Sequence, residues 1–272
     1  MTFLNVVIPV CSLHRSYIQQ CINSIRTQTR IPDKIILVLN EYDKYNSEYE
    51  TIMINNSDCT FIKINTWEKA GINRNIGSKE CKDGIILYQD VDDIMHPQRC
   101  EIVEKCFELY DCDLLLHEYV QLYNYTPFKK MYIYDDKSIE ENIIKSETIM
   151  NILNEKTSFE HGDAIINFSH YFGNTNNKNG HSNITNGECC VKAKILKENE
   201  NIWTNSFEAE DIRFINDITR KYKNTFILTI PLVVIVGNEH IRLIDNKVCH
   251  KKSHKILNYD PVLSKSGLSI SE

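Results

Sequence analysis

Gly84-Ile85-Ile86-Leu87-Tyr88-Gln89-Asp90-Val91-Asp92-Asp93 is the stretch that decides the fold. Its apolar, β-branched half predicts a buried strand, and three carboxylates follow within four residues. In open α/β sheets, ligands bind beyond the carboxyl ends of the strands. Carboxylate oxygens suit Mg²⁺ or Mn²⁺, which keep positions open for phosphate. The stretch therefore predicts a metal–phosphate site at a strand tip; the alternative is an acidic turn that caps the helix expected near Pro97.

The composition predicts a globular protein. The chain has 272 residues, enough for one large α/β domain or two small ones, and 42% of them are hydrophobic, which excludes global disorder. The net charge of −6 argues against a nucleic-acid-binding protein. It also means that an anionic nucleotide would need a cation as a bridge.

The ten cysteines show no regular spacing and no Cys-x-x-Cys pair. The sequence contains no apolar run of about 18 residues, so no membrane span is expected. The apolar segment at the N-terminus is too short for a secretory signal. We therefore expect reduced thiols in a cytoplasmic protein. Cys189-Cys190 lacks the second pair that a structural zinc site would need.

The first 118 residues alternate between strand and helix patterns. Strands are expected at 3–10, 34–39, 59–64, 84–89 and 113–118, and helices at 16–29, 49–55, 69–81 and 97–110. Near-continuous apolar strands separated by helices predict a parallel sheet that is covered on both faces.

The second half is less regular. Residues 119–134 are Tyr-rich and allow a β-ribbon, 138–153 and 209–222 have helical patterns, and the Asn-rich segment 173–187 predicts a loop. A strand is expected at 226–236, where Pro231 indicates an edge or a bulge.

Several motifs occur in a fixed order along the chain. They are Val7-Ile8-Pro9, Ser24-Ile25-x-x-Gln28, Pro32-Asp33-Lys34-Ile35-Ile36-Leu37-Val38, Ala70-Gly71-Ile72-Asn73-Arg74-Asn75-Ile76-Gly77, Asp90-Val91-Asp92-Asp93 and Glu210-Asp211-Ile212-Arg213-Phe214. In this combination the chain resembles family 2 glycosyltransferases with the GT-A (nucleotide-diphospho-sugar transferase) fold.

The resemblance implies a single GT-A domain over residues 1–255, with a Rossmann-like, mostly parallel central sheet and helices on both faces. Residues 1–118 would form the nucleotide-sugar-binding half, 119–255 a less regular acceptor-side half, and 256–272 a surface tail. It also implies a nucleotide-sugar donor, usually UDP-linked, a Mn²⁺ or Mg²⁺ ion, and inversion at the anomeric carbon.

The resemblance also assigns roles to residues. Asp92 would bind the metal and Asp90 would face the ribose or a metal-bound water. Asp211 would be the general base, with Glu210 orienting the sugar or the acceptor. Arg74 would lie against the diphosphate or the uracil. The remaining expected nucleotide-sugar contacts are Pro9, Asn40 and Val91.

Chemistry supports these residue types independently. Direct displacement at the anomeric carbon needs a carboxylate that removes the proton of the attacking hydroxyl. A divalent cation stabilises the charge that develops on the departing diphosphate. The base should therefore lie across the sugar from the metal, and Asp211, at the start of a predicted helix, can approach from the acceptor side.

Two features depart from the family pattern. Asn40 stands where an Asp often reads the uracil, although its side-chain oxygen can still accept from the uracil N–H. A late His often completes the metal shell in this fold, and His240 is the favoured candidate because it follows the strand at 226–236; His250 and His254 are alternatives. His181 could contact a sugar or lie in a plain loop, and core packing is favoured over sugar stacking for Trp67 and Trp203.

Three other functions compete with this reading. A nucleotidyltransferase would need a Gly-rich loop after the first strand, and 10–15 contains no glycine. A phosphohydrolase would need further acidic or histidine ligands at neighbouring strand tips. A catalytically degenerate GT-A module that binds a glycan or protein partner survives as the alternative. The acceptor, a glycan or a protein, is not identified by the sequence, and a lipid-linked acceptor is less favoured.

Overall fold

The computed structural model describes residues 2–121, 133–145, 147–148, 184–205, 210–235, 242–244, 247–249, 261–264 and 267–270. The central sheet has nine strands in the order β3-β2-β1-β4-β8-β6-β9-β5, with β7 also paired to β9. Its strands are β1 Leu4–Val10, β2 Lys34–Leu39, β3 Thr60–Lys63, β4 Ile85–Tyr88, β5 Ile94–Met95, β6 Leu114–Gln121, β7 Ile143–Lys145, β8 Ile184–Lys192 and β9 Thr225–Ile235.

Helices connect these strands. They are α1 Ile18–Arg26, α2 Asn46–Asn55, α3 Ala70–Ser78, α4 Arg99–Tyr110, α5 Asp136–Asn142, α8 Ala193–Glu198 and α9 Glu210–Lys221, with the 3₁₀ helices η1 Ser12–Tyr17 and η2 Tyr42–Tyr45. Two short antiparallel pairs follow, β10 Arg242–Ile244 with β11 Lys247–Cys249 and β12 Pro261–Ser264 with β13 Gly267–Ile270, the latter within the stretch expected to be a tail. In the described part of the chain, no helix is long and apolar enough to cross a membrane.

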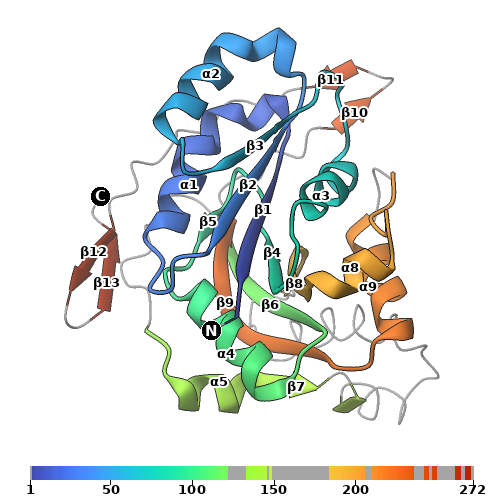
Figure 1. Ribbon diagram of the computed structural model, residues 1–272. Helices are drawn as coiled ribbons and strands as arrows, with labels where there is room; N and C mark the ends of the chain where they lie inside the picture. The colour runs from blue at the N-terminus through green and yellow to red at the C-terminus, as the bar shows by residue number, and fades with distance from the viewer. Residues whose placement is uncertain are drawn as a thin grey trace.

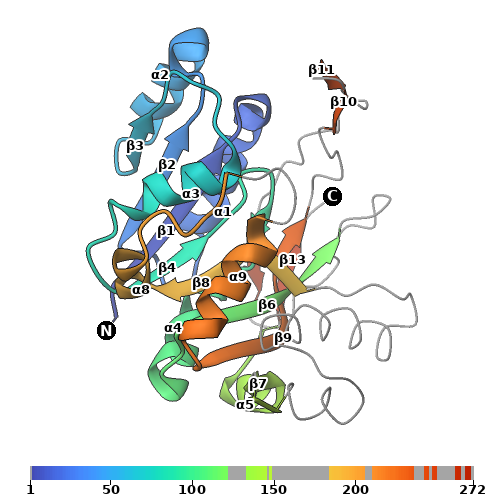
Figure 2. The ribbon, with the colours of Figure 1, turned by 90° about the vertical axis from the view of Figure 1, so that its right-hand side faces the viewer.

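Both faces of the sheet are covered. Helices α3, α8 and α9 lie along the right of the sheet in Figure 1 and in front of it in Figure 2. Alternate residues of β1 serve the two sides: Leu4, Val6, Ile8 and Val10 pack with α1 and α4, and Val7 packs with the cluster that contains α8 and α9. Period-two alternation in a fully buried strand explains both cores. The expected α/β fold with helices on both faces is confirmed.

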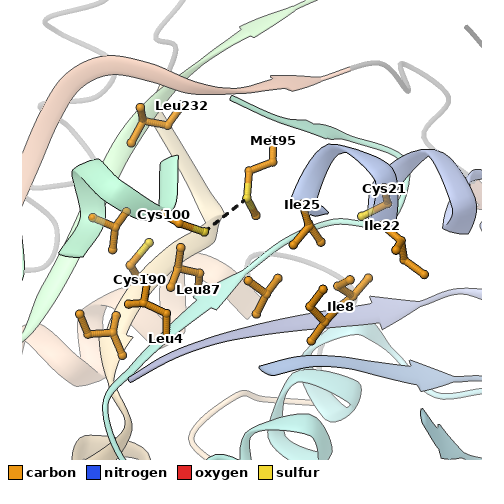
Figure 3. Packing of buried hydrophobic residues seen from close by; sticks show 14 of the residues in the cluster. Leu4, Ile8, Cys21, Ile22, Ile25, Leu87, Met95, Cys100, Cys190 and Leu232 are labelled. Carbon is orange, nitrogen blue, oxygen red and sulfur yellow. Dashed lines mark hydrogen bonds between the residues drawn. The ribbon is translucent and has the colours of Figure 1, made fainter. Parts of the chain in front are cut away.

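Figure 3 shows the first of these cores from close by. Ile8 of β1 and Leu87 of β4 lie below Cys21, Ile22 and Ile25 of α1, and the thiol of Cys100 faces Met95. All of these side chains are buried. The nine cysteines whose side chains the structure describes are free thiols, as the sequence predicted, and eight of them are buried.

The strand order creates a switch point between β1 and β4. The chain runs from β1 to β2 and β3 on one side, then crosses back to place β4 on the other side of β1, and all these neighbours are parallel. Diverging connections open a crevice beyond the carboxyl ends of such strands. The residues after β1 and after β4 therefore lie at the place where a ligand is expected.

The sheet is less uniform than the alternating pattern predicted. The strand expected at 113–118 does not pair with β4, because antiparallel β8 lies between them. Part of β8 comes from the Asn-rich segment 173–187, where a loop was expected: Ile184 and Thr185 pair with β6. Pairing with a neighbouring strand here outweighs the weak intrinsic preference of Asn and Gly for strands.

Two further elements depart from their patterns. The helix expected over 138–153 ends at Asn142, because Ile143 and Ile144 pair with β9 as a short strand. The proline in β9 coincides with a register shift opposite Glu118, so the bulge predicted from Pro231 is confirmed, although β9 lies inside the sheet. Beyond Gln121, the ribbon expected to reach residue 134 lies mostly outside the described residues.

Candidate active site

The acidic tip of β4 lies at the switch point. β4 ends at Tyr88, and the side chains of Asp90 and Asp92 are 38% and 21% exposed. Val91 between them is buried in the core. The Asp93 amide donates to the Asp90 carbonyl (3.2 Å), which closes the turn. The tip therefore presents two carboxylates and buries the apolar side chain between them.

A histidine from the other side of the switch point faces this tip. His14 belongs to η1, directly after β1, and its Nδ1 lies 3.4 Å from Oδ2 of Asp92. A protonated imidazole attracts a carboxylate at this distance, and a neutral one is a ligand for first-row metals. His14 therefore places an imidazole nitrogen next to the carboxylate oxygens of the tip.

Arg74 is the buried cation of the site. It lies on α3 with 2% of its side chain exposed; Nη2 donates to Asp90 Oδ1 (2.8 Å) and Nη1 to Glu210 Oε1 (3.3 Å). Its guanidinium lies 4.6 Å from the ring centre of Trp203. Burial alone would lower the pKa of Arg74, but the carboxylates of Asp90 and Glu210 outweigh burial and raise it. One permanent charge thus bridges the acidic tip and α9.

Close contacts fix α3 between β1 and the start of α9. A Cβ on Gly77 would lie 2.5 Å from a side chain of β1, so glycine allows the helix to approach the strand. Asn75 exchanges two hydrogen bonds with the main chain of Trp203, donating from Nδ2 (2.7 Å) and accepting at Oδ1 (3.1 Å). A Cβ on Gly71 would lie 2.7 Å from the carbonyl of Thr204. Residues 203–204 are therefore held directly against α3.

Glu210 and Asp211 open α9. The helix buries Phe214, Ile215 and Ile218, with Phe214 stacked on Trp203 at 3.9 Å between ring centres. Burial raises the pKa of Glu210, while Arg74 opposes the rise. Oδ1 of Asp211 accepts from the amide of Ile212 (2.8 Å). The apolar stripe thus sets the helix on the sheet and leaves its two first-turn carboxylates on the side of Arg74.

Asn40 lies at the tip of β2, but its side chain is fully buried. Its Nδ2 donates to the Glu68 carbonyl (2.6 Å), and its Oδ1 accepts from Nδ2 of Asn73 (3.0 Å). The Asn40 carbonyl accepts from the Tyr49 hydroxyl (3.0 Å). In this structure Asn40 joins β2 to α3 and to the segment after β3, and its contact with a nucleobase stays a prediction. The predicted contact Pro9 is also buried, within β1.

The rim beside Asn40 is polar and partly strained. Glu41 has a left-handed φ of 51°, which is uncommon for a residue with a side chain. The Ser12 hydroxyl donates to its carboxylate, and this bond, together with Lys44, lowers the pKa of Glu41. Trp67 is 41% exposed, so it lies at the surface and not in the core as expected. Trp203 is buried, which confirms core packing for that residue.

A buried carboxyl group lies behind the tip. Glu188 of β8 accepts the Asp90 N–H at Oε1 (3.3 Å). Burial raises the pKa of Glu188 to about 8, and the Asp90 and Asp92 carboxylates add to the rise against the opposing charge of Arg99. The preceding Gly187 lies so close to Arg74 that a Cβ would meet Nη2 at 3.1 Å. β8 therefore closes the site from behind.

Carboxylates such as those of Asp90 and Asp92 are of the ligand type that a small divalent cation prefers. Mg²⁺ in particular is held by one or two carboxylates and completes its shell with water and substrate phosphate. Among the described residues, no group of three or more His, Cys, Asp or Glu is placed to hold a metal ion. His240, the predicted third ligand, its alternatives His250 and His254, and His181 lie outside the described residues.

The family is decided by a match over more than half of the chain. Residues 5–175 match the model of Glycosyl transferase family 2. The chain belongs to this family. The matched range includes all of β1 but its first residue, together with α3 and the acidic tip, while Glu210 and Asp211 lie beyond it. No curated protein sequence matches the chain significantly.

Solved structures of S. aureus TarS share the fold of this family 2 member. TarS 1-349 in complex with UDP has a TM-score of 0.59 and 14% sequence identity, covering 86% of this chain and 60% of that chain. The complex with UDP-GlcNAc has a TM-score of 0.59 and 14% identity, covering 88% and 59%. This chain thus spans about three fifths of the length of those structures, and the likeness establishes the GT-A fold.

Several site residues were not singled out from the sequence. His14 and Gly187 carry no local motif, and only the strand order brings them to the tip. Glu188 follows a polar segment, and its burial depends on the insertion of β8 beside β4. Arg99, which is also buried beside β8, stands between Gln98 and Cys100 at the start of a predicted helix, and no local pattern indicates its burial.

Proposed function

We propose that this chain is an inverting, metal-dependent glycosyltransferase that moves a sugar from a UDP-sugar to an acceptor hydroxyl. The observation that carries the proposal is the bridge by Arg74 between Asp90 of the acidic tip and Glu210 of α9. It brings carboxylates from the two halves of the chain to the two Nη atoms of one buried cation. Direct transfer needs such a division, with charge stabilisation on one side of the sugar and a base on the other.

Asp92 and Asp90 are the proposed donor-side residues. Asp92 would hold Mn²⁺ or Mg²⁺, with His240 as a further ligand, and Asp90 would face the ribose or a metal-bound water. A bound cation would offset the charge that develops on the departing diphosphate. Arg74 would lie against the diphosphate or the uracil, and because its two Nη atoms already bond Asp90 and Glu210, a bond to a phosphate oxygen would replace one of these.

Asp211 is the proposed base, and Glu210 orients the sugar or the acceptor. Glu210 already contacts Arg74, whereas the described contact of Asp211 is with the amide that follows it. Asp211 would accept the proton of the acceptor hydroxyl as that oxygen attacks the anomeric carbon. Attack from the side opposite the departing diphosphate inverts the configuration at that carbon.

Uridine is proposed as the donor base because the fold is shared with structures of TarS bound to UDP and to UDP-GlcNAc. Pro9, Asn40 and Val91 stay proposed contacts, and since all three side chains are buried, any contact from Pro9 or Val91 would come from the main chain. We further propose one catalytic domain over residues 1–255, a glycan or protein acceptor, and a cytoplasmic location, which the free thiols support.

Two variants test binding and transfer separately. Asp92→Ala removes Mn²⁺-dependent UDP binding, measured by calorimetry. Asp211→Asn keeps that binding but stops the formation of free UDP from UDP-sugars. The assay detects UDP formed by transfer to an acceptor and by slow transfer of the sugar to water. Asp217→Asn is the matched control, because Asp217 lies on the same helix and its side chain is 47% exposed. Unchanged Mn²⁺-dependent binding in the first variant, or near-normal UDP release in the second, would contradict the assignments.

A further inference from the structure

The guanidinium of Arg99 is fully buried directly behind the acidic tip. Arg99 opens α4, yet its side chain turns into the sheet and contacts three strands. Nη1 donates to Gln89 Oε1 (2.7 Å), and Nη2 donates to the carbonyls of Tyr88 (2.9 Å) and Glu188 (2.6 Å). Nε donates to Nε2 of His117 (3.0 Å). One cation therefore ties β4, β6 and β8 together below the site.

The contact with His117 determines the form of that imidazole. A guanidinium only donates hydrogen bonds, so Nε2 of His117 must accept, and the ring proton is on Nδ1. Nδ1 then donates to the Glu118 carbonyl (2.9 Å). Burial lowers the pKa of His117 well below its usual value, and the charge of Arg99 lowers it further. His117 is thus a neutral acceptor that holds Arg99 in place.

The groups bound by Arg99 also hold the main chain of Asp90. Gln89 Nε2 donates to the Asp90 carbonyl (3.0 Å), while the Asp90 N–H donates to the Glu188 carboxyl (3.3 Å). Arg99 bonds the side-chain amide of Gln89, whereas at Glu188 it bonds the main-chain carbonyl and not the carboxyl. Arg99 therefore acts on the Asp90 carbonyl through the Gln89 amide, and on the Asp90 N–H through the main chain of Glu188.

Burying a guanidinium among neutral acceptors has a cost, because a charge loses more hydration than a neutral group. An apolar side chain would fill the same space without that cost. Arg99 instead bonds two residues that contact the Asp90 main chain. Gln89 precedes Asp90 in the sequence, and Glu188 lies on the neighbouring strand β8.

We propose that Arg99 and Gln89 are positioning residues for the acidic tip, which set the direction of the Asp90 and Asp92 carboxylates for the cation and the diphosphate. The proposal rests on the proposed function. In this proposal Arg99 does not only join the strands. It also affects ligand binding, through the Gln89 amide and the Asp90 carbonyl. Groups that orient metal ligands in this way change metal affinity by about 10–100-fold when they are removed.

A matched pair of variants separates this role from plain stability. Gln89→Leu removes the link to Asp90. Gln28→Leu removes another buried glutamine with comparable bonds, from Nε2 to the His96 carbonyl (2.8 Å) and from the Cys100 amide to Oε1 (3.0 Å), without touching Asp90. Urea unfolding measures the stability of each, and calorimetry with UDP and MnCl₂ measures the affinity.

We expect both variants to lose similar stability, but Gln89→Leu to lose about tenfold or more in Mn²⁺-dependent UDP affinity. Gln28→Leu should stay within about twofold of the unaltered protein. Gln89→Glu adds a second readout: it keeps an acceptor for Arg99 but sets an oxygen against the Asp90 carbonyl, so affinity should fall while stability is kept.

Equal affinities for Gln89→Leu and Gln28→Leu, with the unaltered protein binding UDP normally, would overturn the positioning role alone. Undiminished affinity in Gln89→Glu would do the same. An unaltered protein that binds no UDP with Mn²⁺ would instead overturn the proposed function, and the positioning role with it. The two failures are therefore distinguishable.

Discussion

Replacing Arg74 with Met tests whether one buried cation couples the two sides of the site. Arg74 contacts Asp90 at 2.8 Å, Glu210 at 3.3 Å and the face of Trp203 at 4.6 Å. Met fills a similar space without the charge or the donors. The informative quantity is the coupling energy from a double-mutant cycle of Arg74→Met with Asp90→Asn, because the cycle cancels the lost packing on Trp203.

The structure sets the expected size of that coupling. A charge-assisted hydrogen bond contributes about 1.5–3 kcal/mol when it is desolvated. Arg74 is fully buried, but the Asp90 side chain is 38% exposed, so solvent screens part of the attraction. We therefore expect a coupling of about 1–2 kcal/mol between Arg74 and Asp90. The contact between Arg74 and Glu210 is longer, so its coupling energy should be about half as large.

Arg15 and Glu48 provide the control. Their contact is shorter, with Nε 2.6 Å from Oε2 and Nη2 3.1 Å from Oε1, but their side chains are 26% and 52% exposed. An exposed pair of this kind contributes about 0–1 kcal/mol despite its good geometry. Both cycles are measured by urea unfolding in EDTA without nucleotide, followed by two spectroscopic probes. A coupling for Arg74 with Asp90 that does not exceed the coupling for Arg15 with Glu48 would refute the reasoning from burial.

Two further predictions concern β8. Gly187→Ala places a methyl group 3.1 Å from Nη2 of Arg74, so the guanidinium must shift by a few tenths of an ångström and its bond to Asp90 is disturbed. Calorimetry should then record weaker UDP binding with Mn²⁺, and an affinity equal to that of the unaltered protein would mean that the site accommodates the methyl group. Glu188, whose pKa burial raises to about 8 from 4.5, ionises in the unfolded chain before it ionises in the folded one, so it lowers stability progressively as pH rises from about 4.5 to 8. Glu188→Gln keeps an acceptor for the Asp90 N–H and lacks this decline. The free energy of unfolding of Glu188→Gln in EDTA, minus that of the unaltered protein, should therefore increase between pH 5 and pH 8. A constant difference would show that the pKa of Glu188 is not raised by folding.

The fold of the first half follows from local pattern. Apolar strands such as β1 and β2 are buried on both sides, and a strand of that kind between two helices has few stable arrangements other than a parallel sheet. The second half could not be predicted in the same way. β8 begins in a polar segment, and it becomes a strand only because β4 and β6 offer it hydrogen-bonding edges on both sides. Such pairing is not encoded in the segment itself.

The site divides along the same line. Asp90, Asp92, Arg74, Glu210 and Asp211 stand in short motifs, so the sequence could nominate them, and the structure brings Arg74 together with Asp90 and Glu210. The neighbours that act on them come from elsewhere: His14 from the turn after β1, Glu188 from β8 and Arg99 from α4. Their positions depend on strand order and helix packing, which no local pattern contains. Asn40 illustrates the converse, because a residue at the expected tip is taken up by buried hydrogen bonds.

The central claim is that the acidic tip binds a nucleotide through a divalent cation. Thermal unfolding of the protein with UDP, GDP, CDP and ADP, each with and without Mn²⁺, tests it most directly, because a ligand that binds only the folded state raises the unfolding midpoint. We predict a rise with UDP that requires Mn²⁺ and disappears in Asp92→Ala. A midpoint that none of the four nucleotides changes, with Mn²⁺ present, would contradict the claim.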